Sequence, residues 1–288
     1  MSKTLNIHKA ASRGELLKIK EILMTEIDIN KEDKDGYTPL HWAVQEGHEE
    51  VARYLLTNGA DLNKSDKEGF FPLELACTKG HYSIVRLLVE SGCDLSLHRN
   101  HYTPLHSAAA TGRYDIVRYL INTGMNVNKD DSGGYTPVHW ATQEGHLEVL
   151  KLLSDMGGDL EKKDDNGFTP LYIASSFGYD EIVKYLIQQD VNIDPICDDS
   201  SNSTPLNIAC IYNHITTVEF LINSTANIEA TDKRMRTPLF NAALHGNTDI
   251  VKILINHGAN KNVIDKNKKR IYDYRRPKIK AEILELIK

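Results

Sequence analysis

A six-residue pattern, Thr-Pro-Leu-His-x-Ala, recurs along the chain at a nearly fixed interval and constrains the fold more than any other feature. Complete or partial copies begin at Thr38, Phe71, Thr103, Thr136, Thr169, Thr204 and Thr237. The successive spacings are 33, 32, 33, 33, 35 and 33 residues. A period of this length indicates a stack of small units, none of which can bury its apolar face alone.

Each unit predicts two short helices followed by a loop. In the best copy, Thr38 is a good helix N-cap, and Pro39 suits the first helical position, where a missing N–H costs nothing. Gly47 can end this helix in the left-handed conformation, and a second, apolar helix is expected from Glu49 to about Asn58. The turn sequence Asp66-Lys67-Glu68-Gly69 then predicts the tip of a hairpin-like loop.

These residues resemble the ankyrin repeat family from one end of the chain to the other. The best units match D-x-x-G-x-T-P-L-H-x-A, followed by G-H, an apolar helix and G-A-D-x-N. The resemblance implies an all-α solenoid with β-hairpin-like loops, made of about nine units with degenerate N- and C-terminal caps. We expect one ankyrin repeat domain over residues 1–288, with units near 1–32, 33–65, 66–97, 98–130, 131–163, 164–198, 199–231, 232–264 and a cap at 265–288.

The seventh unit departs most from the pattern. Two extra residues precede it, and Asn202, Asn213 and Thr225 replace turn glycines. A β-branched residue adopts a positive φ poorly. We therefore expect the turn at Thr225 to differ from those of the other units.

The composition is that of an ordinary folded protein without membrane segments. Apolar residues make up 41% of the chain and charged residues 26%, which is typical of soluble domains. No apolar run approaches the roughly 18 residues that span a bilayer, and the first residues lack the apolar region of a secretory signal. We expect a cytoplasmic protein, with the nucleus as an alternative, that does not bind membranes.

No motif indicates catalysis, a cofactor or a metal. The chain lacks G-x-S-x-G, a phosphate-binding loop, H-E-x-x-H and C-x-x-C. Twelve histidines invite a metal interpretation, but seven of them occupy two repeated positions: His41, His106 and His139, and His48, His81, His146 and His214. The family resemblance implies that the first set hydrogen-bonds between neighbouring turns. An enzyme would need a titratable cluster without such a structural role, and the sequence shows none.

An aromatic residue stands directly before the capping position in five consecutive units. These residues are Tyr37, Phe70, Tyr102, Tyr135 and Phe168. The resemblance implies that they face a concave groove, where aromatic side chains are frequent binding anchors. Packing of each ring on a neighbouring turn is the alternative. Trp42 and Trp140 share one position inside the first helix, either packed between helices or partly exposed in the groove.

Two further sets of residues are candidates for partner contacts. The ends of the first helices carry the apolar residues Phe177, Ile211, Tyr212 and Leu244 at positions expected to be exposed. They predict an apolar patch, or else local repacking around the irregular unit. Arg234 and Arg236, at a basic hairpin tip, are expected to bind acidic groups of a partner.

Four asparagines occupy the loop position that asparaginyl hydroxylases modify in some members of the family. They are Asn30, Asn63, Asn128 and Asn262. Their more ordinary role would be hydrogen bonding within the hairpin.

The charge distribution argues against nucleic acid as the ligand. The net charge is −6, and no basic stripe follows the groove, although residues 261–288 hold ten basic and four acidic side chains. The sequence therefore predicts a monomeric, non-enzymatic scaffold or adaptor that binds a protein or peptide in its groove. A regulatory, inhibitory or targeting subunit that blocks or recruits an enzyme would use the same surface and remains open.

Overall fold

The computed structural model describes residues 6–197, 202–274, 279 and 281–288. These residues form two compact units. The first unit comprises Met1–Ser132 and Glu148–Gly157, and the second comprises Gly133–Leu147 and Gly158–Lys288.

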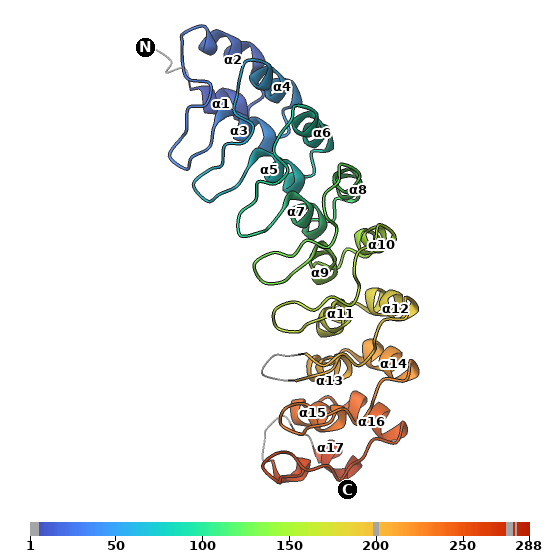
Figure 1. The fold of residues 1–288 in the computed structure, drawn as a ribbon. Coiled ribbons are helices and arrows are strands. Elements are labelled where there is room, and N and C mark those ends of the chain that lie inside the picture. Colours follow the sequence, from blue (N-terminus) through green and yellow to red (C-terminus); the bar gives the residue numbers. More distant parts are fainter. Residues whose placement is uncertain (1–5, 198–201, 275–278, 280) are drawn as a thin grey trace. The chain divides into compact units, whose positions relative to one another are not determined.

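In the first unit, short helices follow one another along the chain from blue to green in Figure 1. They form two rows: we call the row of first helices of each repeat the inner row and the row of second helices the outer row. Neighbouring helices of the same row pack on each other, and each pair packs together within its own repeat. The inner row is formed by α1 (Ile7–Ser12), α3 (Pro39–Gln45), α5 (Pro72–Lys79) and α7 (Pro104–Ala110). The outer row is formed by α2 (Leu16–Leu23), α4 (Glu49–Thr57), α6 (Tyr82–Glu90) and α8 (Tyr114–Asn122), and nearly all of α10 (Leu147–Asp155) also belongs to this unit.

The second unit repeats this arrangement. Its inner helices are α9 (Pro137–Gln143), α11 (Pro170–Phe177), α13 (Pro205–Tyr212) and α15 (Pro238–His245). Its outer helices are α12 (Asp180–Gln188), α14 (Ile215–Asn223) and α16 (Thr248–Asn256). The 3-10 helix η1 (Ile271–Asp273) packs on α15, and α17 (Ala281–Leu286) packs on α16. Residues 275–278 and 280 of the expected C-terminal cap lie outside the described residues.

The capping residues explain why each inner helix starts where it does. Thr38 has the extended conformation of an N-cap, with φ −83° and ψ 166°, and its side chain accepts a hydrogen bond from the backbone N–H of His41. Pro39 follows at the first helical position, and Leu40 is fully buried. Truncating a leucine so buried costs roughly 2–5 kcal/mol. The same Thr-Pro-Leu arrangement therefore fixes both the start of the helix and its buried face.

The expected all-α repeat fold is confirmed. All regular elements among the described residues are helices, and the only pairing of strand type there is an isolated antiparallel bridge between Arg99 and Tyr102. The boundaries of the nine units and their assignment to one domain stay predictions.

The turn at Thr225 does not differ from its counterparts, so that expectation is wrong. Thr225 has φ +69°, in the left-handed region that Gly59 occupies with φ +90° in the second repeat. Its N–H bonds to the carbonyl of Ile222 at 3.0 Å, as the N–H of Gly59 bonds to Leu56 at 3.1 Å. The fold therefore imposes the glycine conformation on a β-branched residue, at a cost of about 1 kcal/mol or more.

Candidate functional site

In five of the hairpin loops, an aspartate at the start of the loop fixes the residue that precedes the helix cap. Asp33 Oδ1 accepts hydrogen bonds from the backbone N–H groups of Asp35 and Tyr37, both at 2.9 Å. The corresponding aspartates Asp66, Asp164, Asp232 and Asp265 accept the same two backbone bonds in their own loops. The backbone at the predicted anchors Tyr37, Phe70 and Phe168 is therefore held by the same turn, whereas the N–H of Tyr102 bonds to the Arg99 carbonyl at 2.7 Å.

Four of the five aromatic rings at this position, all except Phe70, pack on a ring four residues later. The centroid distances are 5.3 Å for Tyr37 and His41, 5.4 Å for Tyr102 and His106, and 5.2 Å for Tyr135 and His139. Phe168 stacks on Tyr172 at 4.7 Å with nearly parallel planes. The rings pack mainly within their own repeat, and Tyr37, Phe70, Tyr102, Tyr135 and Phe168 remain partly exposed. Burial raises the pKa of Tyr102 to about 12.

The repeated histidines are structural, as the sequence predicts. His41 Nδ1 accepts from the backbone N–H of Thr38 at 3.1 Å, so its Nε2 carries the proton and donates to the Phe70 carbonyl at 3.3 Å. Burial lowers the pKa of His41, which favours this neutral form. His139 makes the equivalent bond to the Phe168 carbonyl, and His106 Nε2 contacts the carbonyl of Lys129, which stands earlier in the following loop.

Histidines of the second set bond to backbone carbonyls of the preceding repeat. His48, His81 and His214 contact carbonyls of Ser12, Gln45 and Ser176 through Nε2, at 3.0–3.2 Å. No group of three or more potential metal ligands comes together in the described residues.

The third repeat replaces the usual histidine by a buried acid that the sequence interpretation missed. Glu74 is 2% exposed and stands four residues after Phe70. Its Oε1 lies 3.3 Å from Arg99 Nε, and the Arg99 guanidinium lies 3.6 Å from the centre of the Phe70 ring. Burial raises the pKa of Glu74 to about 7, although the charge of Arg99 opposes this shift. Two departures from the repeated motif indicate this site in the sequence. Glu74 stands where the motif has His, and Phe71 stands where it has Thr.

A pocket of about 390 Å³ lies between the second and third hairpin loops of the first unit. The rings of Tyr37 and Trp42 line it, with centroids 5.1 Å apart, and Asp66 and Glu68 line it from the next loop. Trp42 is held in place because its indole N–H donates to Asp33 Oδ2 at 2.9 Å. The sequence had left its packing or exposure open, and the structure shows a partly exposed, anchored ring.

Only part of the predicted apolar patch in the second unit is exposed. Phe177 and Tyr212 are 50% and 59% exposed at the last positions of α11 and α13, and Ile211 is partly exposed. Leu244 is only 1% exposed, so its expected exposure is wrong. It precedes the last residue of α15 by one position, which turns a side chain by about 100° around the helix.

The two candidate arginines also differ. Arg234 is exposed. Arg236 is 7% exposed and is engaged within the protein, with its guanidinium 3.5 Å from Asp265 Oδ2 and 3.3 Å from the Tyr274 hydroxyl. The expectation that Arg236 contacts acidic groups of a partner is therefore contradicted by its burial and its internal ion pair.

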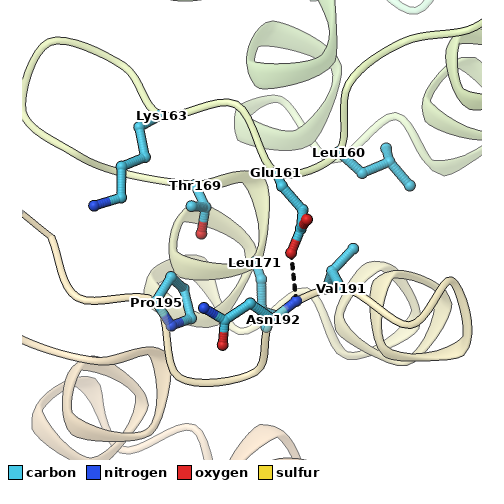
Figure 2. Close-up of a pocket in the computed structure, with 8 residues that line it drawn as sticks. All are labelled: Leu160, Glu161, Lys163, Thr169, Leu171, Val191, Asn192 and Pro195. Carbon is cyan, nitrogen blue, oxygen red and sulfur yellow. Dashed lines mark hydrogen bonds between the residues drawn. The ribbon is translucent and has the colours of Figure 1, made fainter.

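The side chains of three loop asparagines, Asn30, Asn63 and Asn128, bond to the neighbouring repeat, which corrects for them the expectation of bonds within the hairpin. The backbone N–H groups of these three and of Asn262 do bond within their own loops. Asn30 Oδ1 accepts from the N–H of Asp61 at 2.7 Å, and Asn63 Oδ1 accepts from Asp94 at 2.9 Å. In the second unit Glu161 takes this role and accepts from Asn192 N at 2.6 Å, as Figure 2 shows. The surrounding cavity of about 220 Å³ is lined mainly by loop residues on either side of this bond, which indicates a gap in loop packing.

The structure gives one finding on membranes. Among the described residues, the helices are all too short or too polar to span a bilayer.

Two family models cover most of the chain. The model for ankyrin repeats in three copies matches residues 7–99, 91–164 and 156–232, and the model for a single ankyrin repeat matches residues 235–266.

Curated proteins resemble this chain over shorter stretches. Ankyrin repeat domain-containing protein 7 of Homo sapiens is 45% identical over 49 residues, which is 17% of this chain and 19% of the relative. Osteoclast-stimulating factor 1 of Danio rerio is 44% identical over 45 residues, 16% of this chain and 21% of the relative. Acyl-CoA-binding domain-containing protein 1 of Arabidopsis thaliana is 41% identical over 46 residues, which is 16% of this chain and 14% of the relative. The similarity thus spans a minor part of each relative.

Proposed function

Because the chain belongs to the ankyrin repeat family, we propose that it is a non-enzymatic scaffold or adaptor that binds a protein or peptide through its hairpin loops. Ankyrin repeats are in general protein–protein interaction modules. The proposed surface consists of the hairpin residues before each helix cap and the last residues of the inner helices. We call it the hairpin face.

The observation that carries the proposal is the row of partly exposed rings on successive repeats within each unit. In the first unit these are Tyr37, Phe70 and Tyr102, and in the second they are Tyr135 and Phe168. Aromatic side chains are enriched among residues that dominate binding energy. Their repetition at one structural position gives a partner several anchors along one face.

The rings are fixed before any partner binds. Loop aspartates hold the backbone of Tyr37, Phe70 and Phe168. The rings of Tyr37, Tyr102, Tyr135 and Phe168 pack on His41, His106, His139 and Tyr172, and the Arg99 guanidinium lies on the Phe70 ring. Side chains already ordered lose little rotational freedom on binding, a loss that otherwise opposes association by about 0.5–1.5 kcal/mol per side chain. A prepacked row of rings is therefore suited to recognition.

The second unit adds exposed apolar and basic groups to the same proposal. Phe177 and Tyr212 occupy the same helix end in successive repeats, with Ile211 beside Tyr212, and Arg234 is exposed at a hairpin tip. Leu244 and Arg236 are left out because they are buried.

A protein partner fits better than nucleic acid. The net charge of the chain is −6, and the pocket between the second and third hairpins is lined by three carboxylates against one lysine. Such a surface repels phosphate groups. The proposal includes a monomeric protein in the cytoplasm or nucleus.

Affinity capture from a lysate of the source cells tests the proposal. The baits are the wild-type chain, a Tyr37→Ala/Tyr102→Ala variant, and a Tyr82→Ala/Tyr114→Ala control. The control removes two tyrosines that are 40% and 41% exposed on the outer helices of the same unit. We expect the wild type and the control to retain a common partner that the hairpin variant loses, because two anchors together contribute about 2 kcal/mol or more. Equal capture by all three folded proteins would contradict the proposal.

A further inference from the structure

The pocket between the second and third hairpins combines ring faces with carboxylates. Tyr37 and Trp42 provide two rings inclined by 46°. Asp35 and Glu68 are exposed, and both line the opening. This is a mixed apolar and anionic lining and not a purely acidic cluster.

Asp66 brings a largely buried carboxylate to the same pocket. It is 7% exposed, and its Oδ1 already accepts two backbone bonds, from Glu68 at 2.9 Å and Phe70 at 2.8 Å. Its Oδ2 accepts no hydrogen bond in the described part of the chain. A donor on a ligand can therefore form a charge-assisted hydrogen bond with this carboxylate oxygen.

A comparison with the other hairpins explains why this oxygen lacks a donor. The second oxygen of the hairpin aspartate usually bonds to the side chain nine residues later. Asp33 bonds in this way to Trp42, Asp232 to Asn241 and Asp265 to Tyr274. Leu75 stands nine residues after Asp66 and has no side-chain donor. The missing bond is therefore a property of this sequence.

The pocket also lies in a negative field. Burial raises the pKa of Tyr37, and the charges of Asp66, Glu68, Asp33 and Asp35 raise it further. Lys67 is the one cation that lines the pocket, and its ammonium group donates to the carbonyl of Lys34 at 2.6 Å. Three carboxylates and one ammonium group leave the lining negative.

We infer that this pocket receives a basic side chain, arginine or lysine, from an extended peptide segment of the partner. The inference rests on the proposed function and names the chemistry of its ligand. The cation would lie against the faces of Tyr37 and Trp42, where ring quadrupoles attract positive charge. Its N–H groups would donate to Asp66 Oδ2 and to the carboxylates of Asp35 and Glu68, in charge-assisted hydrogen bonds.

The same combination recurs in the second unit. The rings of Tyr135 and Trp140 have centroids 5.5 Å apart, and Asp164 is 6% exposed with a buried Oδ2 that lacks a hydrogen-bond partner. Ile173, nine residues after Asp164, again offers no donor. The pairing of a tyrosine–tryptophan ring pair with an unsatisfied hairpin aspartate thus occurs twice, which argues against an accident of one loop.

Nuclear magnetic resonance of the full-length, ¹⁵N-labelled chain tests the inference directly. The chain has two tryptophans, so the indole N–H of Trp42 gives one of two side-chain signals, and a Trp140→Phe variant assigns it. The probes are the blocked peptides acetyl-Gly-Ser-Arg-Ser-Gly-amide and the same peptide with glutamine at the centre. We expect a saturable shift of the Trp42 signal with the arginine peptide and an affinity at least about tenfold lower for the glutamine peptide.

Charge variants provide the matched control. Asp35→Asn/Glu68→Gln removes two exposed carboxylates and should weaken the arginine peptide about tenfold. Glu50→Gln removes an exposed carboxylate from the outer helix α4 and should leave the affinity unchanged. An unmoved Trp42 signal, equal responses to both peptides, or equal losses in the pocket variant and the control would overturn the inference.

The two tests fail independently. A negative peptide titration removes the basic side chain as the ligand of this pocket but leaves the capture of a partner by the hairpin rings intact. Equal capture of the partner by the wild type and by the hairpin variant would contradict the proposed function, whatever the titration shows.

Discussion

The guanidinium of Arg99 lies 3.6 Å from the centre of the Phe70 ring, on one of the predicted anchors of the hairpin face. The same side chain forms an ion pair with the buried Glu74. Phe70 is therefore a predicted anchor that is covered by a charged group of the next repeat. Any partner that contacts Phe70 meets the arginine as well.

The buried carboxyl of Glu74 predicts a specific pH dependence of stability. Burial raises the pKa of this carboxyl in the folded protein to about 7, above its ordinary value of 4.5. A raised carboxyl pKa means that the folded state holds the proton more tightly, so stability falls as the pH rises from about 4.5 to about 7. Glu74→Gln stays neutral and should gain roughly 2 kcal/mol relative to wild type between about pH 5 and about pH 8.

Urea unfolding at the two pH values measures this gain. Glu50→Gln, an exposed control on α4, should show a much smaller pH-dependent difference from wild type. A pH-independent difference for Glu74→Gln would show that Glu74 stays ionised in the folded protein.

The buried ion pair of the last repeats predicts opposite outcomes for two neighbouring arginines. Arg236→Ala leaves Asp265, 2% exposed, without its cation, and should lower the free energy of unfolding by about 3 kcal/mol. Arg234 is exposed, so Arg234→Ala should change the free energy of unfolding by less than about 0.5 kcal/mol. Chemical denaturation of both variants checks this. Similar stabilities for the two would mean that the Arg236–Asp265 pair contributes little.

The left-handed Thr225 predicts a stabilising substitution. The residue is exposed, and its φ of +69° disfavours a β-branched side chain. Thr225→Gly should therefore raise the free energy of unfolding by about 0.5–1 kcal/mol. Asp190 occupies the matching turn with φ +58°, and Asp190→Gly should gain less, because aspartate tolerates this region better. An unfolding temperature of Thr225→Gly below that of the wild type would contradict the inferred backbone strain at Thr225.

The repeat pattern predicted most of the local structure. Thr38 caps its helix, His41 links neighbouring loops, and the residue before the cap is partly exposed. These features depend on contacts within one repeat or with the next, which recur at a fixed spacing. They can therefore be inferred from the motif.

The failures concern single residues whose environment the motif does not determine. Leu244 and Ile211 occupy the same position, one before the end of their helices, but Leu244 is buried and Ile211 is partly exposed. Arg236 was read as a surface charge because its partner Asp265 lies 29 residues later in the degenerate cap. The acceptor at Asp66 depends on what stands nine residues later, a relationship that appears only when several hairpins are compared in three dimensions.

Site-specific photo-crosslinking tests the central claim, that partners bind the hairpin face, most directly. A benzoyl-phenylalanine would replace Tyr37 on the hairpin face or Tyr114, 41% exposed on the outer helix α8. Both proteins would be irradiated in a lysate of the source cells, and the products would be identified by mass spectrometry. We predict a crosslinked partner at position 37 and none at position 114. A partner crosslinked at position 114 but not at position 37 would contradict the account.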